Sequence, residues 1–285
     1  MLPQGSDLEY FLTITEAGSL TAASVRLGIA QPSLTLAVQR LERDMGVVLF
    51  ERSQRGVKLT PAGQNVLLGV RAMKDSWQQL KDQVHDQQHQ ISGRVSLGCH
   101  PAVATYTLPA LVLQLQKQYP AVELQLRHDL SRHLTTAVIE RELDVGLVIN
   151  PLRHPDLVIR SLLHDEVGFW VAKDFQFKSI DQHPLIADPD LLQVQTLLRR
   201  VGGKRLRFRP LLATSQLEVV ASLTLAGAGI GILPHRVAMA LGRKGLRPLK
   251  EFPTFRDELC LIYRPERRTR PVVKALLNLI TNTHS

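Results

Sequence analysis

Residues 17–63 constrain the fold most strongly, because two short helical segments follow each other there with only a tight turn between them. Ser19 is a good N-cap residue for the first helix, and Gly28 is suited to end it. Pro32, a residue favoured in the first turn of a helix, opens a second helix that is expected to end at Gly46. The pair predicts a helix-turn-helix, whose second helix enters the major groove of DNA with its N-terminus first.

The residues that follow are suited to form a wing of two short strands. Residues 50–52 and 57–59 can pair as a hairpin that places basic side chains where they would meet phosphates. At the start of the second helix, Gln and Thr side chains can hydrogen-bond base edges, and Leu36 can contact a thymine methyl group. The residues predicted to contact DNA are Ser19, Thr21, Gln31, Pro32, Ser33, Thr35, Leu36, Gln39, Arg52, Arg55 and Lys58.

This stretch resembles the DNA-binding domain of LysR-type transcriptional regulators. The resemblance implies base contacts from the start of the second helix, at residues 31, 32, 35 and 36, and a DNA contact from the wing at Arg52. Leu36 departs from the family, which often has Arg or another polar residue there. A structural three-helix unit without a DNA role is the alternative, but burial alone would not require Gln31 or Arg52. The matching residues are Phe11, Gly18, Ser19, Ala22, Ala23, Leu27, Gln31, Pro32, Leu41, Glu42, Gly46, Leu49, Phe50, Arg52, Arg55, Leu59, Thr60, Ala62 and Gly63.

Helices are predicted on both sides of this stretch. Ser6 and Glu9 have the spacing of a capping box before a helix over 8–17, and Thr60-Pro61 is a typical helix start. The second of these helices carries an apolar seam with heptad spacing, which favours a two-chain coiled coil over packing against the chain's own C-terminal domain. The family resemblance agrees, and we expect a homodimer or homotetramer. The seam consists of Val66, Val70, Met73, Trp77, Leu80 and Val84.

The length and composition of the chain suit a two-domain cytoplasmic protein. A chain of 285 residues accommodates two domains, and no apolar run reaches the length of a membrane span. The N-terminus has no signal-peptide pattern, and two cysteines provide no disulfide framework. The net charge of +9 is poor evidence for DNA binding, because residues 1–91 carry nine basic and nine acidic side chains. The excess lies in residues 92–285, with 26 basic and 17 acidic side chains.

From residue 92 onward, short apolar strands alternate with helices, which predicts an α/β domain with a largely parallel sheet. The predicted elements include helices over 108–119, 134–141, 216–226 and 272–281, and strands over 95–98, 122–127, 143–149, 166–172 and 259–263. The region resembles the effector domain of LysR-type regulators, which is built like a two-lobed periplasmic binding protein. The motifs are Gly98, Leu108-Pro109, Tyr119-Pro120, the run 143–146 and the run 226–234.

The expected fold class is α/β overall, with three parts in chain order. They are a winged helix-turn-helix over 1–60, a long linker and dimerisation helix over 61–91, and a two-lobed, periplasmic-binding-protein-like effector domain over 92–285. Lobe 1 is expected to cover about 92–161 and 266–285, and lobe 2 about 162–265.

A ligand of such a domain is expected in the cleft between the lobes, where strand ends and helix N-termini favour anions. The resemblance implies Ser or Thr where His100 and Ala102 stand. Three interpretations stay open: the effector differs from small carboxylates, His100 takes over a polar contact, or the cleft is not a functional receptor. A purely structural role for His100 is a further alternative. The predicted effector-binding residues are His100, Pro101, Ala102, Val103, Asn150, Thr214 and Ser215.

A dense basic run stands between residues 199 and 209. A solvated face is the simplest interpretation, and attraction of an acidic partner, an anionic effector or bent DNA is the other. The run consists of Arg199, Arg200, Lys204, Arg205, Arg207 and Arg209.

No pattern of catalytic, cofactor-binding or metal-ligating residues stands out, so we expect a regulator and not an enzyme. The expected partners are double-stranded operator DNA, a small-molecule effector for which an anion is one candidate, and, as a further candidate, RNA polymerase. The alternatives are a ligand-binding protein of the transport type and a redox-responsive regulator that uses Cys99 and Cys260. Nothing in the sequence brings the two thiols together or activates them.

Overall fold

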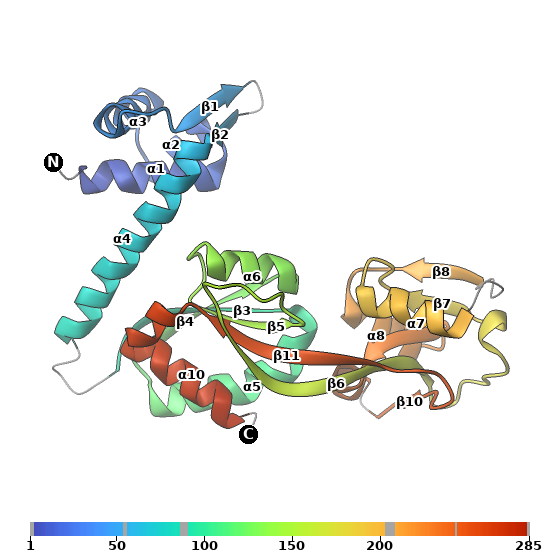
Figure 1. Ribbon diagram of the computed structural model, residues 1–285. Coiled ribbons are helices and arrows are strands. Elements are labelled where there is room, and N and C mark those ends of the chain that lie inside the picture. The colour runs from blue at the N-terminus through green and yellow to red at the C-terminus, as the bar shows by residue number, and fades with distance from the viewer. Residues whose placement is uncertain (1–2, 54–55, 86–90, 203–208, 243, 284–285) are drawn as a thin grey trace. The chain divides into compact units, whose positions relative to one another are not determined.

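The computed structural model describes residues 3–53, 56–85, 91–202, 209–242 and 244–283 (Figure 1). Tertiary contacts divide the chain into two compact units, Met1–Lys81 and Asp82–Ser285, and each unit has its own buried core. Within the described ranges, no helix is both long enough and apolar enough to cross a membrane.

The N-terminal unit follows the predicted helix-turn-helix and wing. The Ser19 hydroxyl caps the second helix by accepting a hydrogen bond from the Ala22 N–H (3.0 Å). Gly28 and Gly46 end the second and third helices in the left-handed conformation, each with φ of 69°. The elements are α1 Gly5–Ala17, α2 Leu20–Leu27, α3 Gln31–Met45, β1 Phe50–Ser53, β2 Gly56–Leu59 and α4 Pro61–His85.

The capping box predicted for the first helix is wrong. Helix α1 begins at Gly5, and its N-cap residue Gln4 makes no side-chain capping bond. Ser6 and Glu9 are therefore inside the helix, where they cannot act as N-cap and third helical residue. Asp7 lies in the first turn of α1, where its buried carboxylate accepts two hydrogen bonds from the Arg40 guanidinium (3.1 and 2.7 Å), a tertiary contact that favours the early start of the helix.

The wing is fixed to the helices by hydrogen bonds that its backbone N–H groups donate. The Glu42 carboxylate, near the end of α3, accepts a hydrogen bond from the Leu49 N–H (2.8 Å) at the base of the hairpin. The Val57 N–H donates to the Gly18 carbonyl oxygen (2.9 Å) in the turn between α1 and α2. Gly56 permits this approach, because it has φ of 118° and an added Cβ would lie 2.3 Å from that oxygen.

Helix α4 divides its apolar seam between two environments. Val70 is buried and Val66 is partly buried in the core of the N-terminal unit. These two residues were predicted to contact a second chain, but they pack in the core of their own unit instead. Beyond this point the helix leaves that core, and Met73, Trp77 and Leu80 are 46%, 62% and 50% exposed.

The C-terminal unit is a mixed sheet covered by helices, with the strand order β4-β3-β5-β11-β6-β9-β7-β8 and with β10 paired to β6. Its elements are β3 Gly93–Cys99, α5 Pro101–Gln118, β4 Val122–His128, α6 Ser131–Ile139, β5 Val145–Ile149, β6 Val158–Ala172, η2 Ile180–Gln182, β7 Pro184–Ala187, α7 Leu192–Gly202, β8 Arg209–Ala213, α8 Leu217–Leu225, β9 Ile230–Pro234, α9 His235–Leu241, β10 Leu246–Pro248, β11 Phe255–Tyr263, η3 Pro265–Thr269 and α10 Pro271–Thr283.

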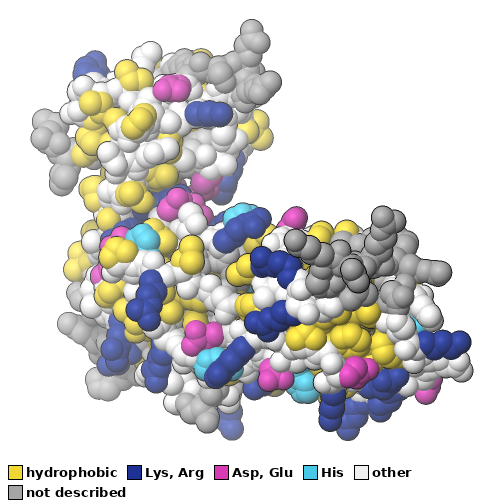
Figure 2. Space-filling model, turned by 45° about the vertical axis from the view of Figure 1, so that its right-hand side comes forward, with side chains coloured by type: hydrophobic (Ala, Val, Ile, Leu, Met, Phe, Trp, Pro, Cys, Tyr) yellow, Lys and Arg dark blue, Asp and Glu magenta, His cyan; other side chains and the backbone are white. Residues whose placement is uncertain are grey.

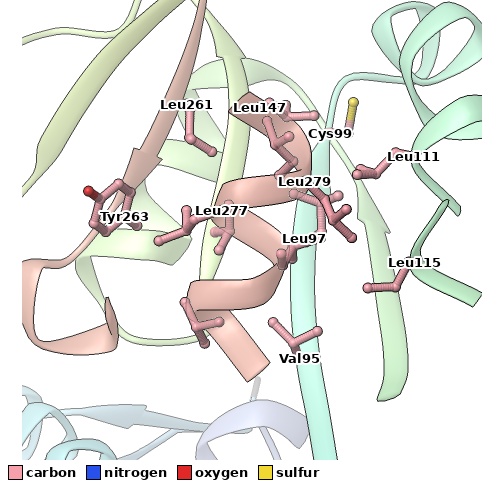
Figure 3. Packing of buried hydrophobic residues seen from close by; sticks show 14 of the residues in the cluster. Val95, Leu97, Cys99, Leu111, Leu115, Leu147, Leu261, Tyr263, Leu277 and Leu279 are labelled. Atoms are coloured by element: carbon pink, nitrogen blue, oxygen red, sulfur yellow. The ribbon is translucent and has the colours of Figure 1, made fainter. Parts of the chain in front are cut away.

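Two long antiparallel strands, β6 and β11, join two lobes (Figure 1). In lobe 1, β3 lies parallel between β4 and β5, and β5 pairs with β11. In lobe 2, β7 lies parallel between β8 and β9, and β9 pairs with β6. Figure 3 shows the core of lobe 1, in which Leu97 of β3, Leu147 of β5, Leu111 of α5 and Leu279 of α10 pack together. The last helix thus returns to lobe 1, as the sequence predicts.

Several elements differ from their predicted bounds. Helix α5 begins at Pro101 instead of residue 108 and contains Pro109 in its interior. It starts earlier because Pro101 occupies its first turn, while Ala102 and Val103 are buried directly behind it. Helices α7 and α9 were not predicted, and β6 and β11 are longer than the apolar runs that indicated them.

A buried ion cluster holds the last part of the chain to lobe 1. The Asp144 carboxylate accepts hydrogen bonds from the Ser96 N–H and hydroxyl (2.8 and 3.0 Å). The same carboxylate pairs with the guanidinium groups of Arg267 and Arg270 (3.0 and 2.9 Å). All three charged residues are at most 6% exposed, so the cluster is a buried network in which both guanidinium groups are paired with one carboxylate.

Candidate DNA-binding and effector sites

Helix α3 has one buried face and one exposed face. Leu34, Val38 and Leu41 lie in the core of the N-terminal unit. The opposite face exposes Pro32, Leu36, Gln39 and Arg43, which are four, three and four residues apart and therefore form one stripe. Leu36 is 57% exposed, so a large apolar side chain is free at this face to contact a partner.

The predicted contact residues of the helix pair are only partly free. Gln31, Ser33 and Thr21 are exposed, and the Thr21 hydroxyl donates to the Gln31 amide oxygen (3.5 Å). Thr35 is half-buried, and the oxygen of Ser19 is used by the helix cap. The structure brings Gln31, Ser33 and the exposed stripe together at the start of α3, while Ser19 mainly orients α2.

Basic side chains near the helix pair fall into two groups. Arg26 pairs with Glu16 of α1 (2.9 Å), and Arg40 pairs with buried Asp7. Both ion pairs link α1 to another helix of the N-terminal unit. Lys58 is exposed on the wing opposite Glu51. The Arg52 side chain and all of Arg55 lie outside the described residues.

The predicted effector residues lie where parallel strands end. His100 follows β3, Asn150 follows β5, and Thr214 follows β8. The Thr214 hydroxyl oxygen accepts the Gln216 N–H (3.3 Å), and Ser215 is exposed beside it. The three strand ends belong to both lobes, which is the arrangement expected of a ligand site at the point where two lobes meet.

The first turn of α5 corrects part of this prediction. Ala102 is fully buried in the apolar cluster that contains Leu217 and Val220 of lobe 2, and Val103 is buried in the core of lobe 1. Both were predicted to contact the effector, but their side chains are structural. Because they carry no hydroxyl groups, they gain more from burial than from facing a polar ligand.

His100 has a structural role that the sequence left open. Its Nδ1 accepts the Ala102 N–H (3.2 Å), so the imidazole caps α5. Burial lowers the pKa of His100, with the strongest opposing effect from the charge of Glu218. The histidine is therefore neutral near pH 7. The surroundings of His100 are acidic because Asp129, Asp188 and Glu218 lie near it. The sequence did not predict this, because the three residues come from separate segments.

A pair of buried carboxylates lies in the strands that join the lobes, and sequence reasoning missed it. Asp165 of β6 and Asp257 of β11 are directly opposite each other, and they are 8% and 2% exposed. The Asn150 side chain donates to Asp257 Oδ1 (2.7 Å), and the Gln193 amide donates to Oδ2 (3.5 Å). Asp257 thus links lobe 1 to lobe 2. The only signal in the sequence was the alternation of side chains between the two faces of a strand, and this alternation does not distinguish a buried Asp from an exposed one.

This pair predicts a component of stability that depends on pH. Burial raises the pKa of Asp257 to about 6, helped by the charge of Asp165 and opposed by the Asn150 hydrogen bond. The folded state therefore binds the proton more tightly than the unfolded state, whose Asp has a pKa of about 3.9. The stabilisation is complete below pH 4 and is lost as the pH rises through 6. We expect a loss on the order of 2 kcal/mol between pH 4 and pH 8.

The measurement is urea unfolding at several pH values of the protein and of an Asp257→Asn variant. Asn does not titrate. The unfolding free energy of the unmodified protein minus that of the variant should therefore decrease with rising pH. A difference that stays constant from pH 4 to pH 8 would contradict the assignment.

The two cysteines are placed apart. Cys99 packs with α5 on one face of the sheet, and Cys260 packs with α6 on the other. Their strands, β3 and β11, are separated by β5, a gap of about 9–10 Å that exceeds the span of a disulfide. Burial raises the pKa of Cys99 to about 12 and that of Cys260 to about 11. Neither geometry nor acidity supports a redox switch between them.

Comparison with known proteins identifies the family. Residues 6–64 match the model for bacterial regulatory helix-turn-helix proteins of the lysR family, and residues 88–285 match the LysR substrate binding domain. The chain belongs to the LysR family of transcriptional regulators. It is a DNA-binding regulator with an effector-binding domain, and the proposed resemblance of both parts is confirmed.

Individual relatives agree with this assignment. The HTH-type transcriptional regulator GltR of Bacillus subtilis (strain 168) is 27% identical over 251 residues, which cover 84% of this chain and 82% of GltR. Full-length LysG from Corynebacterium glutamicum with bound effector Arg has a TM-score of 0.67 and 17% identity, with 100% of this chain and 98% of LysG covered. CbnR complexed with its target DNA has a TM-score of 0.53 and 24% identity, covering 98% and 99%. The two structures show a shared fold.

Proposed function

We propose that the start of α3 reads the operator: Gln31, Ser33 and, from the exposed stripe, Gln39 hydrogen-bond base edges, while Leu36 of the stripe contacts a thymine methyl group. Lys58, Arg52 and Arg55 of the wing would contact phosphates, which position the helix without reading sequence. The observation that carries this proposal is the exposure of these side chains: α3 exposes Gln31 and Ser33 in its first turn, and Leu36 and Gln39 in the turns that follow.

We infer that α4 pairs two copies of the chain through Met73, Trp77 and Leu80, with Val84, whose side chain lies outside the described residues, as the next position of the seam. Three large apolar side chains exposed at heptad spacing are a pairing face, and a second copy offers the same face in return. Two helix-turn-helix units would then bind two half-sites as a dimer or a dimer of dimers.

The effector is proposed to bind at the strand ends near His100, Asn150, Thr214 and Ser215. The acidic surroundings of His100 favour the interpretation that this effector differs from a small carboxylate. Binding would change the relative placement of the lobes and so the output at the promoter, with RNA polymerase as the responding partner. The protein would act in the cytoplasm by binding, without catalysis.

Two substitutions separate the proposed roles on DNA. Gln31→Ala is expected to weaken binding to the operator by about 1–3 kcal/mol and to leave random DNA almost unaffected, because only a base contact is lost. Arg52→Ala is expected to weaken binding to every duplex and to reduce the salt slope by about one, because a phosphate contact is lost. Fluorescence anisotropy with both duplexes at several salt concentrations measures these effects.

Gln118→Ala is the control, since Gln118 is exposed at the end of α5 in the other unit. It should change neither affinity. If Gln31→Ala and Arg52→Ala reduced binding to operator and random DNA by equal factors, the proposed division between base and phosphate contacts would be wrong.

A further inference from the structure

A cavity of about 930 Å³ opens beside the strands that join the two lobes. Its walls include Tyr106 of α5 in lobe 1, Glu166 of β6, Arg256 of β11, and Arg236 and Met239 of α9 in lobe 2. The volume is within the range of small-molecule sites. None of its lining residues belongs to the effector group proposed around His100, so this cavity, here called the hinge cavity, is a separate site.

The hinge cavity contains hydrogen-bond donors that the protein does not use. Arg236 and Arg256 are exposed, and neither guanidinium has a hydrogen-bond or ion-pair partner among the residues that the structure describes. The Tyr106 hydroxyl likewise has no hydrogen-bond partner among the residues that the structure describes. By contrast, the guanidinium groups of Arg264 and Arg270 are paired with carboxylates in lobe 1.

Within the described part of the chain, the acidic groups beside these arginines form no hydrogen bond or ion pair with the guanidinium groups, although burial raises the pKa of Asp165 and the charge of Arg236 opposes that shift. Asp165 is buried, and its carboxylate oxygens accept the Glu166 N–H (2.9 Å) and the Arg236 N–H (3.1 Å). Glu166 is directly opposite Arg256 in the two strands, yet the two side chains form no ion pair. The guanidinium N–H groups of Arg236 and Arg256 therefore remain available to an anionic group in the cavity.

The remaining wall of the hinge cavity contains His164 and His235 together with apolar surface. The Tyr106 ring lies on one side, and Met239, which is 41% exposed, and Ala240 lie in α9. Basic side chains are also more widespread than acidic ones over the visible face of the C-terminal unit in Figure 2, in agreement with 26 basic and 17 acidic residues over 92–285. Such a charge excess raises the local concentration of anions.

We propose that the hinge cavity is a second ligand site for an organic carboxylate, whose anionic group contacts Arg236 and Arg256 and whose hydrocarbon body lies against Tyr106 and Met239. Because the walls come from both lobes and from the strands between them, the ligand contacts all three parts at once. A ligand that contacts both lobes favours the lobe arrangement in which all its contacts are made, and so biases the regulator independently of the first effector.

Calorimetry on the full chain tests this site with benzoate and hexanoate as carboxylate probes, and with benzyl alcohol as an uncharged probe of similar shape. We expect both carboxylates to bind saturably and benzyl alcohol not to bind. Arg236→Gln and Arg256→Gln should each weaken carboxylate binding about tenfold, the loss of one charge-assisted bond. Arg160→Gln is the matched control, because Arg160 is exposed on the same strand β6 outside the cavity.

The proposal is overturned if neither carboxylate binds saturably, if benzyl alcohol binds as tightly as benzoate, or if Arg160→Gln weakens binding as much as Arg236→Gln. It is also overturned if His100→Ala abolishes carboxylate binding while Arg236→Gln leaves it unchanged, because the ligand would then occupy the first site. Circular dichroism verifies that each variant is folded. Since the measurement needs no DNA, its failure leaves the proposed reading of the operator intact, and the converse also holds.

Discussion

Replacing Asp144 by Ala is expected to destabilise the C-terminal unit by about 3–5 kcal/mol. The Asp144 carboxylate pairs with both buried Arg267 and buried Arg270, and it also holds Ser96 of β3. Without it, both guanidinium groups lose the buried carboxylate that they share, which costs far more than the loss of a single hydrogen bond. Asp144→Asn should cost less, because the amide oxygen still accepts hydrogen bonds.

Unfolding of this unit can be followed through Trp170, which is 3% exposed and donates to the Leu233 carbonyl oxygen (3.0 Å). A Trp77→Phe background removes the other tryptophan signal. Glu123→Ala is the matched control: its ion pair with Arg94 (3.0 Å) is exposed on both sides and is expected to contribute at most about 1 kcal/mol. Equal effects of Asp144→Ala and Glu123→Ala on the urea midpoint would contradict the importance of the buried cluster.

Trp77→Glu is expected to lower the oligomeric state of the protein. Trp77 is the largest side chain of the exposed seam of α4 and lies between Met73 and Leu80. A carboxylate at the centre of a helix pair would be buried next to its copy from the other chain. Burial of the charge and repulsion between the like charges would both destabilise the pair. Affinity for the operator should decrease as well, because two half-sites would no longer be bound by one linked pair of domains.

Light scattering coupled to size exclusion measures the mass directly. Gln78→Glu is the matched control, since it adds the same charge one residue later, about 100° further round the helix and away from the seam. It should leave the mass unchanged. An unchanged mass for Trp77→Glu would contradict the proposed pairing role of α4.

The N-terminal unit was predictable because its signals are local. Ser19, Gly28 and Gly46 act on their own neighbours, and each cap lies where the sequence indicated it. The exception is the start of α1, where Asp7 is held by Arg40, a contact across 33 residues that no local pattern reveals. The division of the α4 seam was missed for the same reason: heptad spacing does not say where the helix leaves its own core.

The C-terminal unit was predictable in its class but less so in its site. Apolar runs in the strands indicated the lobes. For a polar residue at a strand end, however, the sequence does not show which other residue it contacts. Asp257 and Asp165 meet only because β6 and β11 pair, and Arg236 and Arg256 reach one cavity from an unpredicted helix and the far end of a strand. His100 was recognised as unusual, but its capping role depends on α5 beginning at Pro101, seven residues before the predicted start.

The central claim is that this chain is a sequence-specific regulator, and a salt titration of DNA binding tests it most directly. The two duplexes are the DNA just upstream of the protein's own gene and a random duplex of equal length. The account predicts tighter binding to the upstream DNA, with a salt slope that corresponds to several phosphate contacts on both duplexes. Absence of binding to either duplex at low salt would contradict the assignment of α3 and the wing as a DNA-reading surface.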